Sequence, residues 1–209
     1  MIKIKLWKKV LIGILILCLL LIGVVVNKFV ILTKLTNKSK QISNKANYLA
    51  IATSLQNNYV TIQKSYNKNG NYLTKTQIYG KDIEQERSFT TYNKENEKVG
   101  IIQYGEEKTA IINGGNMLGG QVHVNSASDI FEDTLQRLKW SIASKITTND
   151  KYYIVELNNS ILYINKQTGL IDKSIDNAIM SEVYYEFDVV TDSDIERPDI
   201  SDCKIKEEN

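Results

Sequence analysis

Apolar positions are distributed very unevenly along the chain. Residues 10–26 read VLIGILILCLLLIGVVV, seventeen positions without a charged or strongly polar side chain. After Asn27 and Lys28 the run FVIL extends the stretch to Leu32, which is long enough to span a bilayer if Lys28 snorkels to the head groups. A segment in hydrocarbon must satisfy its own backbone hydrogen bonds, so it must be helical. The pattern predicts a transmembrane anchor over 10–32 behind a short cytoplasmic tail over 1–9.

A cleaved signal peptide is the alternative to a retained anchor, and it requires small residues at a cleavage site. The first alanine is Ala46, and the residue before Cys18 is Leu17, so neither a signal peptidase site nor a lipoprotein site is recognisable. Four lysines precede the helix and four follow it closely, so the positive-inside count is a tie. The short tail ahead of a long domain favours a single-pass protein of the cell membrane, with a cytoplasmic N-terminus and an extracytoplasmic domain.

Beyond a polar, lysine-rich segment over 33–46, expected as a stalk or a helical continuation, short strand-like segments dominate. They are rich in Tyr, Thr, Ile and Val and are bounded by turn residues. Short connections predict antiparallel strands in meander order. The strands are expected at 47–55, 59–66, 71–79, 85–92, 98–104, 108–113, 151–157, 160–165, 170–175 and 180–190. In the last of these, Val183, Tyr185, Phe187 and Val189 alternate with polar residues, which predicts one buried and one wet face.

One helix interrupts the strands, from Asp129 to Ile142, with Ser128 as its expected cap. Apolar side chains at helical spacing form one face, made of Ile130, Phe131, Thr134, Leu135, Leu138 and Ile142. An antiparallel sheet of about ten strands must curl. We therefore predict a mainly β (α+β) domain over 47–190, a strongly curved half-barrel sheet with the helix packed in its concave side. An acidic tail over 191–209 follows.

Charge separates the chain into two parts. Residues up to Lys81 include 13 lysines and no acid, whereas the remainder has 24 acids against 13 bases. Because the basic excess lies beside the hydrophobic helix and lysine outnumbers arginine 23 to 3, membrane lipid is a better partner than nucleic acid. Abundant lysine, asparagine and isoleucine also indicate an AT-rich bacterial genome.

Candidate chemistry is sparse. Cys18 lies within the apolar segment and Cys203 lies near the C-terminus, so we expect neither a disulfide nor a shared metal site between them. His123 has no serine or cysteine nucleophile motif beside it. The paired glycines in 114–128 lack the ending of a phosphate loop. The acidic run over 192–196 begins like a calcium loop, but Arg197 occupies the glycine position. We therefore expect no catalytic residue, no metal and no cofactor, and a protein that is not an enzyme.

The block YINKQTGLIDKS (163–174), after the YYIVEL hairpin strand and before VYYEFDVV (183–190), resembles the lipoprotein-carrier (LolA/LolB-like) half-barrel superfamily. The order of strands, helix and strands agrees with it. The resemblance implies a curved sheet around an apolar concavity that holds lipid or acyl chains without catalysis.

Two functions follow from these observations. The first is an anchored, extracytoplasmic binding or sensing module with a lipid or acyl chain in the concavity, and its ligand-binding residues are expected to be Phe131, Leu135, Leu138, Tyr185 and Phe187. The alternative is an envelope interaction subunit that docks another cell-envelope protein and has a filled core without a ligand. All 12 tyrosines lie beyond the anchor, where they suit strands and could also line a surface for an acyl chain or a peptide.

Overall fold

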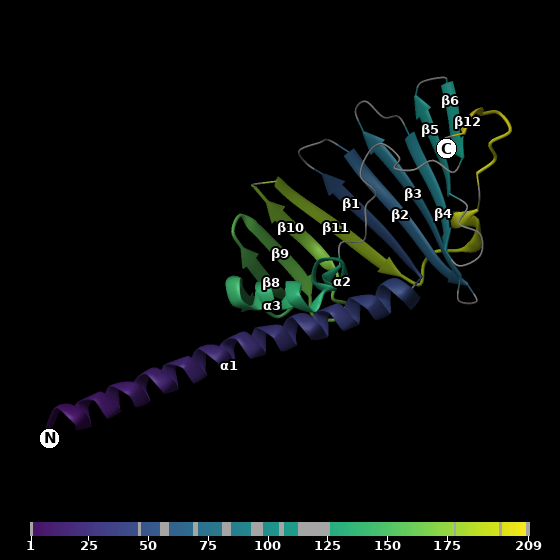
Figure 1. Ribbon diagram of the computed structural model, residues 1–209. Coiled ribbons are helices and arrows are strands. Elements are labelled where there is room, and N and C mark those ends of the chain that lie inside the picture. The colour runs from purple at the N-terminus through teal and green to yellow at the C-terminus, as the bar shows by residue number, and fades with distance from the viewer. Residues whose placement is uncertain are drawn as a thin grey trace.

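The computed structural model describes residues 2–45, 47–54, 59–68, 71–80, 85–92, 98–104, 107–112, 126–177, 179–196 and 198–207. Its N-terminal part is a single helix, α1 (Ile2–Lys45), whose first half projects away from the domain (Figure 1). Within these ranges, one helix is long and apolar enough to cross a membrane, over Trp7–Ile42. This position near the N-terminus suits a signal sequence or an anchor.

Twelve strands of the described chain form one open sheet, in the order β12-β6-β5-β4-β3-β2-β1-β11-β10-β9-β8-β7. Neighbouring strands are antiparallel except β12, which pairs in parallel with β6. The strands are β1 (Tyr48–Ser54), β2 (Tyr59–Lys68), β3 (Asn71–Gly80), β4 (Gln85–Tyr92), β5 (Lys98–Tyr104), β6 (Glu107–Ile112), β7 (Lys145–Thr148), β8 (Tyr152–Leu157), β9 (Ser160–Asn165), β10 (Ile171–Asp176), β11 (Ile179–Phe187) and β12 (Lys204–Glu207).

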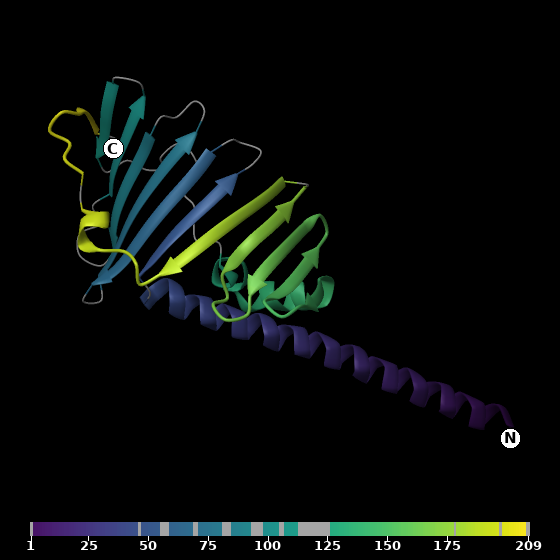
Figure 2. The same cartoon turned by 180° about the vertical axis from the view of Figure 1, so that it is seen from behind.

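Two meanders, β1–β6 and β7–β11, join through the pairing of β1 with β11 (Figure 2). Tyr48 lies opposite Phe187 and Ala50 opposite Tyr185 in this central ladder. The antiparallel meanders confirm the topology expected from the short connections. No strong curl is detected in the sheet, which is open, with β7 and β12 at opposite edges.

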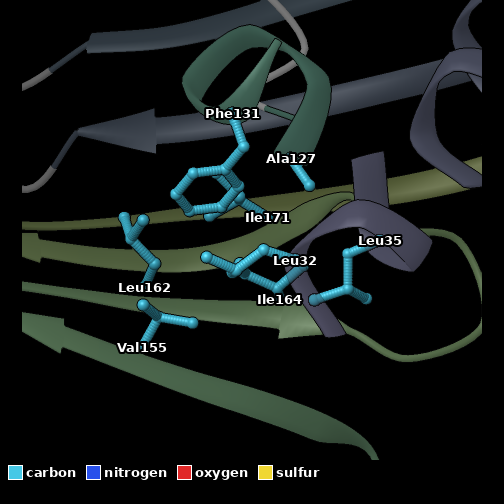
Figure 3. Packing of buried hydrophobic residues seen from close by; sticks show 8 residues of the cluster. All are labelled: Leu32, Leu35, Ala127, Phe131, Val155, Leu162, Ile164 and Ile171. Atoms are coloured by element: carbon cyan, nitrogen blue, oxygen red, sulfur yellow. The ribbon is translucent and has the colours of Figure 1, made fainter. Parts of the chain in front are cut away.

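The second half of α1 is part of the domain core. Leu32 and Leu35 are fully or almost fully buried, and they pack with Phe131 and with the strand residues Ile164 and Ile171 (Figure 3). The hydrophobic run therefore changes its surroundings at about Ile31, although its composition does not change. The segment expected as a stalk or helical continuation, 33–46, is helical to Lys45.

The single helix expected over Asp129–Ile142 is wrong, because the structure has two helices, α2 (Ala127–Phe131) and α3 (Thr134–Ala143). Ser126, not Ser128, caps α2 and forms a capping box with Asp129. Asp133 then starts α3, since its carboxylate accepts hydrogen bonds from two backbone N–H groups of the next turn. The restart at Asp133 breaks the apolar face that the spacing predicted.

The end of β11, the segment beyond residue 190 and strand β7 also differ from the sequence prediction. The strand expected to reach residue 190 ends at Phe187, because Asp188 adopts a left-handed φ of 59°. Val189 is then exposed, and Val190 is buried with Ile195 of the 3-10 helix η1 (Asp192–Ile195). The tail expected beyond residue 190 thus contains η1 and the edge strand β12, and β7 was not predicted at all.

Candidate functional site

We call the sheet face that α1 and α2 cover the inner face. Over β8–β10 it is packed by buried side chains, from Val155 and Leu162 to Ile164 and Ile171. Phe131, an expected ligand-binding residue, is completely buried there, and its ring meets that of Trp140 edge-on with centroids 5.2 Å apart. Because the Phe131 ring fills this part of the core, an acyl chain has no room beside it.

The expected ligand-binding residues do not come together. Tyr185 and Phe187 belong to a second cluster on the inner face, with Tyr48 at its centre, and their rings stack at 6.5 Å. Leu135 and Leu138 point the other way and are 73% and 43% exposed. The five residues therefore lie in three different environments.

On the inner face, the described buried side chains of β2 and β3 are polar rather than apolar. Residues that lie opposite each other in an antiparallel ladder share one face of the sheet. The partners of Tyr48 and Ala50 in β2, and the partners of those residues in β3, are polar. The buried polar side chains of β2 and β3 are Thr61, Gln63, Ser65 and Thr76. An acyl chain would gain little from such a lining, since the hydrophobic effect scales with apolar area.

The opposite, outer face has an open groove of about 600 Å³. Tyrosines from three strands line it, and charged side chains lie among them. The outward-facing lining residues are Ile51, Thr53, Tyr152, Tyr163, Lys173, Glu182 and Tyr184. Lys151, Asn165 and Asp172 border it where β10 departs from regular register. The groove therefore lies across β1 and β8–β11.

The aromatic rings in the groove are held by each other and by lysines. Tyr152 and Tyr163 meet edge-on, with centroids 5.9 Å apart. The ammonium nitrogen of Lys173 lies 5.7 Å from the ring centre of Tyr163 and 3.1 Å from the carboxylate of Glu182. Tyr184, in contrast, is 60% exposed. The groove thus combines fixed aromatic surface with one ring available to a partner.

Asp172 organises the border of the groove. Its carboxylate accepts a hydrogen bond from the Asn165 amide at 3.2 Å and lies 3.1 Å from the Lys151 ammonium group. Hydrogen bonds to Tyr152 and to Asp172 raise the pKa of Lys151. Burial, with Asp172 nearby, raises the pKa of Tyr185 beneath the groove. Lys151 is therefore held charged and Tyr185 neutral, so the border is a fixed ion pair rather than a proton donor or acceptor near neutral pH.

The acidic run over 192–196 has a structural role in the described chain. Asp194 accepts hydrogen bonds from the backbone and side chain of Thr191 and forms an ion pair of 2.6 Å with Lys64. These contacts, led by the one with Lys64, hold the pKa of Asp194 well below its usual range. In the ranges that the structure describes, no group of three or more His, Cys, Asp or Glu residues is placed to hold a metal ion. His123 and the paired glycines at 114–115 and 119–120 lie outside the described residues.

The position of the groove was not predicted from the sequence, although two expected ligand-binding residues, Tyr185 and Phe187, are among the residues that line it. Tyr152, Tyr163 and Tyr184 occupy the outward positions of three strands, where a polar residue is usual. Their occurrence on the wet side of each strand marks one surface. Recognising it required the register that aligns these strands, and that register depends on the bulge at Asp172.

No family model matches this chain, and no curated protein matches it. Among solved structures the chain is similar to a DUF1329 family protein from Desulfovibrio piger ATCC 29098, at 11% identity and a TM-score of 0.34, over 83% of this chain and 97% of that chain. The lipoprotein-carrier resemblance is not confirmed by these comparisons. A likeness at this score assigns neither a fold family nor a function, so the proposal below depends on the geometry of the groove and of α1.

Proposed function

We propose that this chain is a membrane-anchored module of the cell envelope that binds a polypeptide segment of another envelope protein in its tyrosine-lined groove, without catalysing a reaction. One observation carries the proposal: over β8–β10 the inner face is filled by the chain's own residues, while the outer face has an open aromatic groove. This favours the interaction subunit over the lipid-holding module.

The packing of the inner face supports this choice. A lipid carrier needs an apolar space that an acyl chain can enter. Leu32 and Leu35 of α1 instead occupy the surface of β9 and β10, together with Phe131. Within the described residues, a lipid chain would have to displace the helix that anchors the domain.

The chemistry of the groove suits a polypeptide. Tyrosine rings supply apolar contact area at a low cost in conformational entropy, and their hydroxyl groups bond to backbone amides. Lys173 and Glu182 present one charge of each sign beside the rings. A partner segment with an aromatic or aliphatic anchor residue and a charged neighbour would be complementary to this surface.

The anchor gives the proposal its location. Residues from Val10 to Val26 are apolar throughout, and all except the half-buried Val25 are exposed along α1. We propose that this part is retained in the cell membrane, with the N-terminus in the cytoplasm and the domain outside. Protease added to intact spheroplasts should then remove the domain while the extreme N-terminus stays protected.

The test uses the full-length chain in its native membrane, with a photo-crosslinking amino acid in place of Tyr184. We expect a discrete polypeptide adduct, and we expect it to disappear when Tyr163→Lys is added in the groove. The matched control carries the same crosslinker at Asn159, an exposed turn residue between β8 and β9. An adduct of equal yield at both positions would contradict a specific groove.

A photoreactive fatty acid supplies the second measurement. Labelling of peptides that contain Phe131 or Ile171 would mean that lipid reaches the inner face, and the lipid-holding module would replace our proposal. Labelling of the exposed apolar residues of α1 up to Val30, without labelling of Phe131 or Ile171, is the expected result, because that part of α1 would face the bilayer.

A further inference from the structure

Helix α3 has its apolar side on the outside of the domain. Ser141 is buried, and Trp140 packs on Phe131, so these residues define the side of α3 that faces the core. Residues at spacings of three, four and seven share one helical face. The face opposite the core has three large apolar side chains that are 73%, 43% and 62% exposed, and they are Leu135, Leu138 and Ile142.

This exposed stripe is unusual for a short surface helix, because an amphipathic helix normally buries its apolar side. Within the described chain, the stripe has no protein surface against it. Contiguous exposed apolar side chains mark a site that contacts another molecule or a membrane. The position of α3 along α1 decides between these possibilities.

The end of α3 lies beside the end of the apolar run of α1. The ammonium group of Lys28 donates a hydrogen bond to the backbone carbonyl of Ser144, the residue after α3. Two turns earlier, in α3, the guanidinium carbon of Arg137 lies 5.8 Å from the ring centre of Phe29. Both cartoon views show α3 next to α1, at the point where the first half of α1 leaves the domain (Figures 1 and 2).

Helical rise places this point at the edge of the hydrocarbon. At 1.5 Å per residue, the distance from Val10 to Val30 is about 30 Å, the thickness of a typical hydrocarbon core. Val30 is the last large apolar residue of α1 that is exposed, since Leu32 and Leu35 are buried. The last turns of α3 therefore lie at the head-group layer if α1 spans the bilayer, and amphipathic helices bind there.

Charges near the stripe suit the same surface. Lys34, Lys139 and Lys145 are exposed around this junction, and Lys28 lies within it. Cations beside a membrane attract anionic head groups, each within about a Debye length of the surface. Apolar side chains next to lysines are the combination that an anionic bilayer surface recognises.

We propose that α3 is a membrane-interface helix: Leu135, Leu138 and Ile142 insert at the boundary between head groups and acyl chains, next to the point where α1 leaves the bilayer. The inference rests on the proposed anchoring of α1 but not on the groove. The domain would then contact the membrane through two helices, α1 across the bilayer and α3 at its surface. The domain cannot swivel about a single helix, so the tyrosine groove keeps one orientation above the membrane.

The experiment uses the full chain in nanodiscs of phosphatidylcholine and phosphatidylglycerol, with Cys18→Ser and Cys203→Ser as background. A single cysteine labelled with an environment-sensitive fluorophore is introduced by Leu138→Cys or, independently, by Ile142→Cys. Lipids with a spin label near the head group quench a fluorophore at the interface, and lipids with a label deep on the acyl chain quench a fluorophore within the hydrocarbon. Ile16→Cys reports on the span, and Asn159→Cys is the exposed control on the far turn.

We expect the head-group label to quench the fluorophore at 138 and at 142 about two-fold, the acyl-chain label to quench it at 16, and neither label to quench it at 159. Quenching at 16 without quenching at 138 and 142 would overturn the membrane contact of α3 and leave the anchor intact. No quenching at 16 would overturn the anchoring itself, and the proposed function with it. A fluorophore at 138 that is shielded from water but not quenched by lipid would mean that a second copy covers the stripe, which also overturns the proposal.

Discussion

The backbone of Gly169, in the turn between β9 and β10, lies directly against the backbone of Leu35 in α1. A methyl group on Gly169 would be 2.3 Å from the Leu35 carbonyl oxygen and 2.9 Å from the amide nitrogen of Ser39. Gly169 also has a φ of 72°, in the left-handed region that favours glycine. The turn and the anchor helix are therefore in contact without an intervening side chain.

Gly169→Ala should destabilise the domain by at least about 2 kcal/mol, because it adds a backbone clash to an unfavourable φ. The measurement is urea unfolding of the full chain in detergent, followed by tyrosine fluorescence. Gly23→Ala is the matched control, since no atom lies within 4 Å of a methyl group placed there. Equal stability of the two variants would mean that α1 does not pack against this turn.

Phe131→Ala should cost about 3–5 kcal/mol, the usual range for a buried aromatic residue. Leu135→Ala, on the exposed stripe, should change the free energy of unfolding in detergent by less than about 0.5 kcal/mol. The sequence placed both residues on one packed face, whereas the structure separates them. Similar losses of unfolding free energy in the two variants would mean that Phe131 and Leu135 lie on one packed face, as the sequence predicted.

Asp133→Ala should cost about 1 kcal/mol, because the carboxylate satisfies the N–H groups of Leu135 and Gln136 at the start of α3. Asp133→Asn keeps a side-chain acceptor and should retain most of the stability. Thermal unfolding by circular dichroism distinguishes the two variants. If both were as stable as the wild type, α3 would not begin at Asp133.

Acid should weaken the contact between η1 and β2. The pKa of Asp194 is lower in the folded protein than in the unfolded chain, so its ion pair with Lys64 contributes fully above about pH 4 and is lost as pH falls further. Both side chains are partly exposed, which limits the contribution to about 1 kcal/mol.

Asp194→Asn should therefore reduce the loss of unfolding free energy as pH falls from 5 to 2, by up to about that amount. Asp150→Asn, in an exposed turn, serves as the control. An unchanged pH dependence in Asp194→Asn would show that the ion pair does not stabilise the domain.

Local patterns predicted the elements, and contacts between distant residues decided the rest. The strand with Val183, Tyr185 and Phe187 was recognisable because alternation is a property of neighbouring positions. Leu32 could not be assigned to the core, since a lipid-facing and a core-facing leucine look alike in a hydrophobic run. The pairing of β12 with β6 was also invisible, because parallel strands so far apart leave no local sign.

The groove was harder to predict than the fold. Tyr152, Tyr163 and Tyr184 were visible as tyrosines in strands, but their alignment depends on the register of four strands. The expected ligand-binding set failed to come together for a different reason. Leu135 and Leu138 were assigned to the face of Phe131 by helical spacing, and that spacing has no meaning across the restart at Asp133.

The pairing of β1 with β11 also determines when the domain can fold during synthesis. β1 is the first strand to leave the ribosome, yet its partner from Ile179 to Phe187 is among the last. Until β11 is synthesised, the first meander has an unpaired edge at β1. Leu32 and Leu35 are also without their packing partners until β8–β10 are synthesised. The nascent chain would thus be tethered at its N-terminus with its central ladder open, which is the period when a chaperone or a wrong strand could bind it.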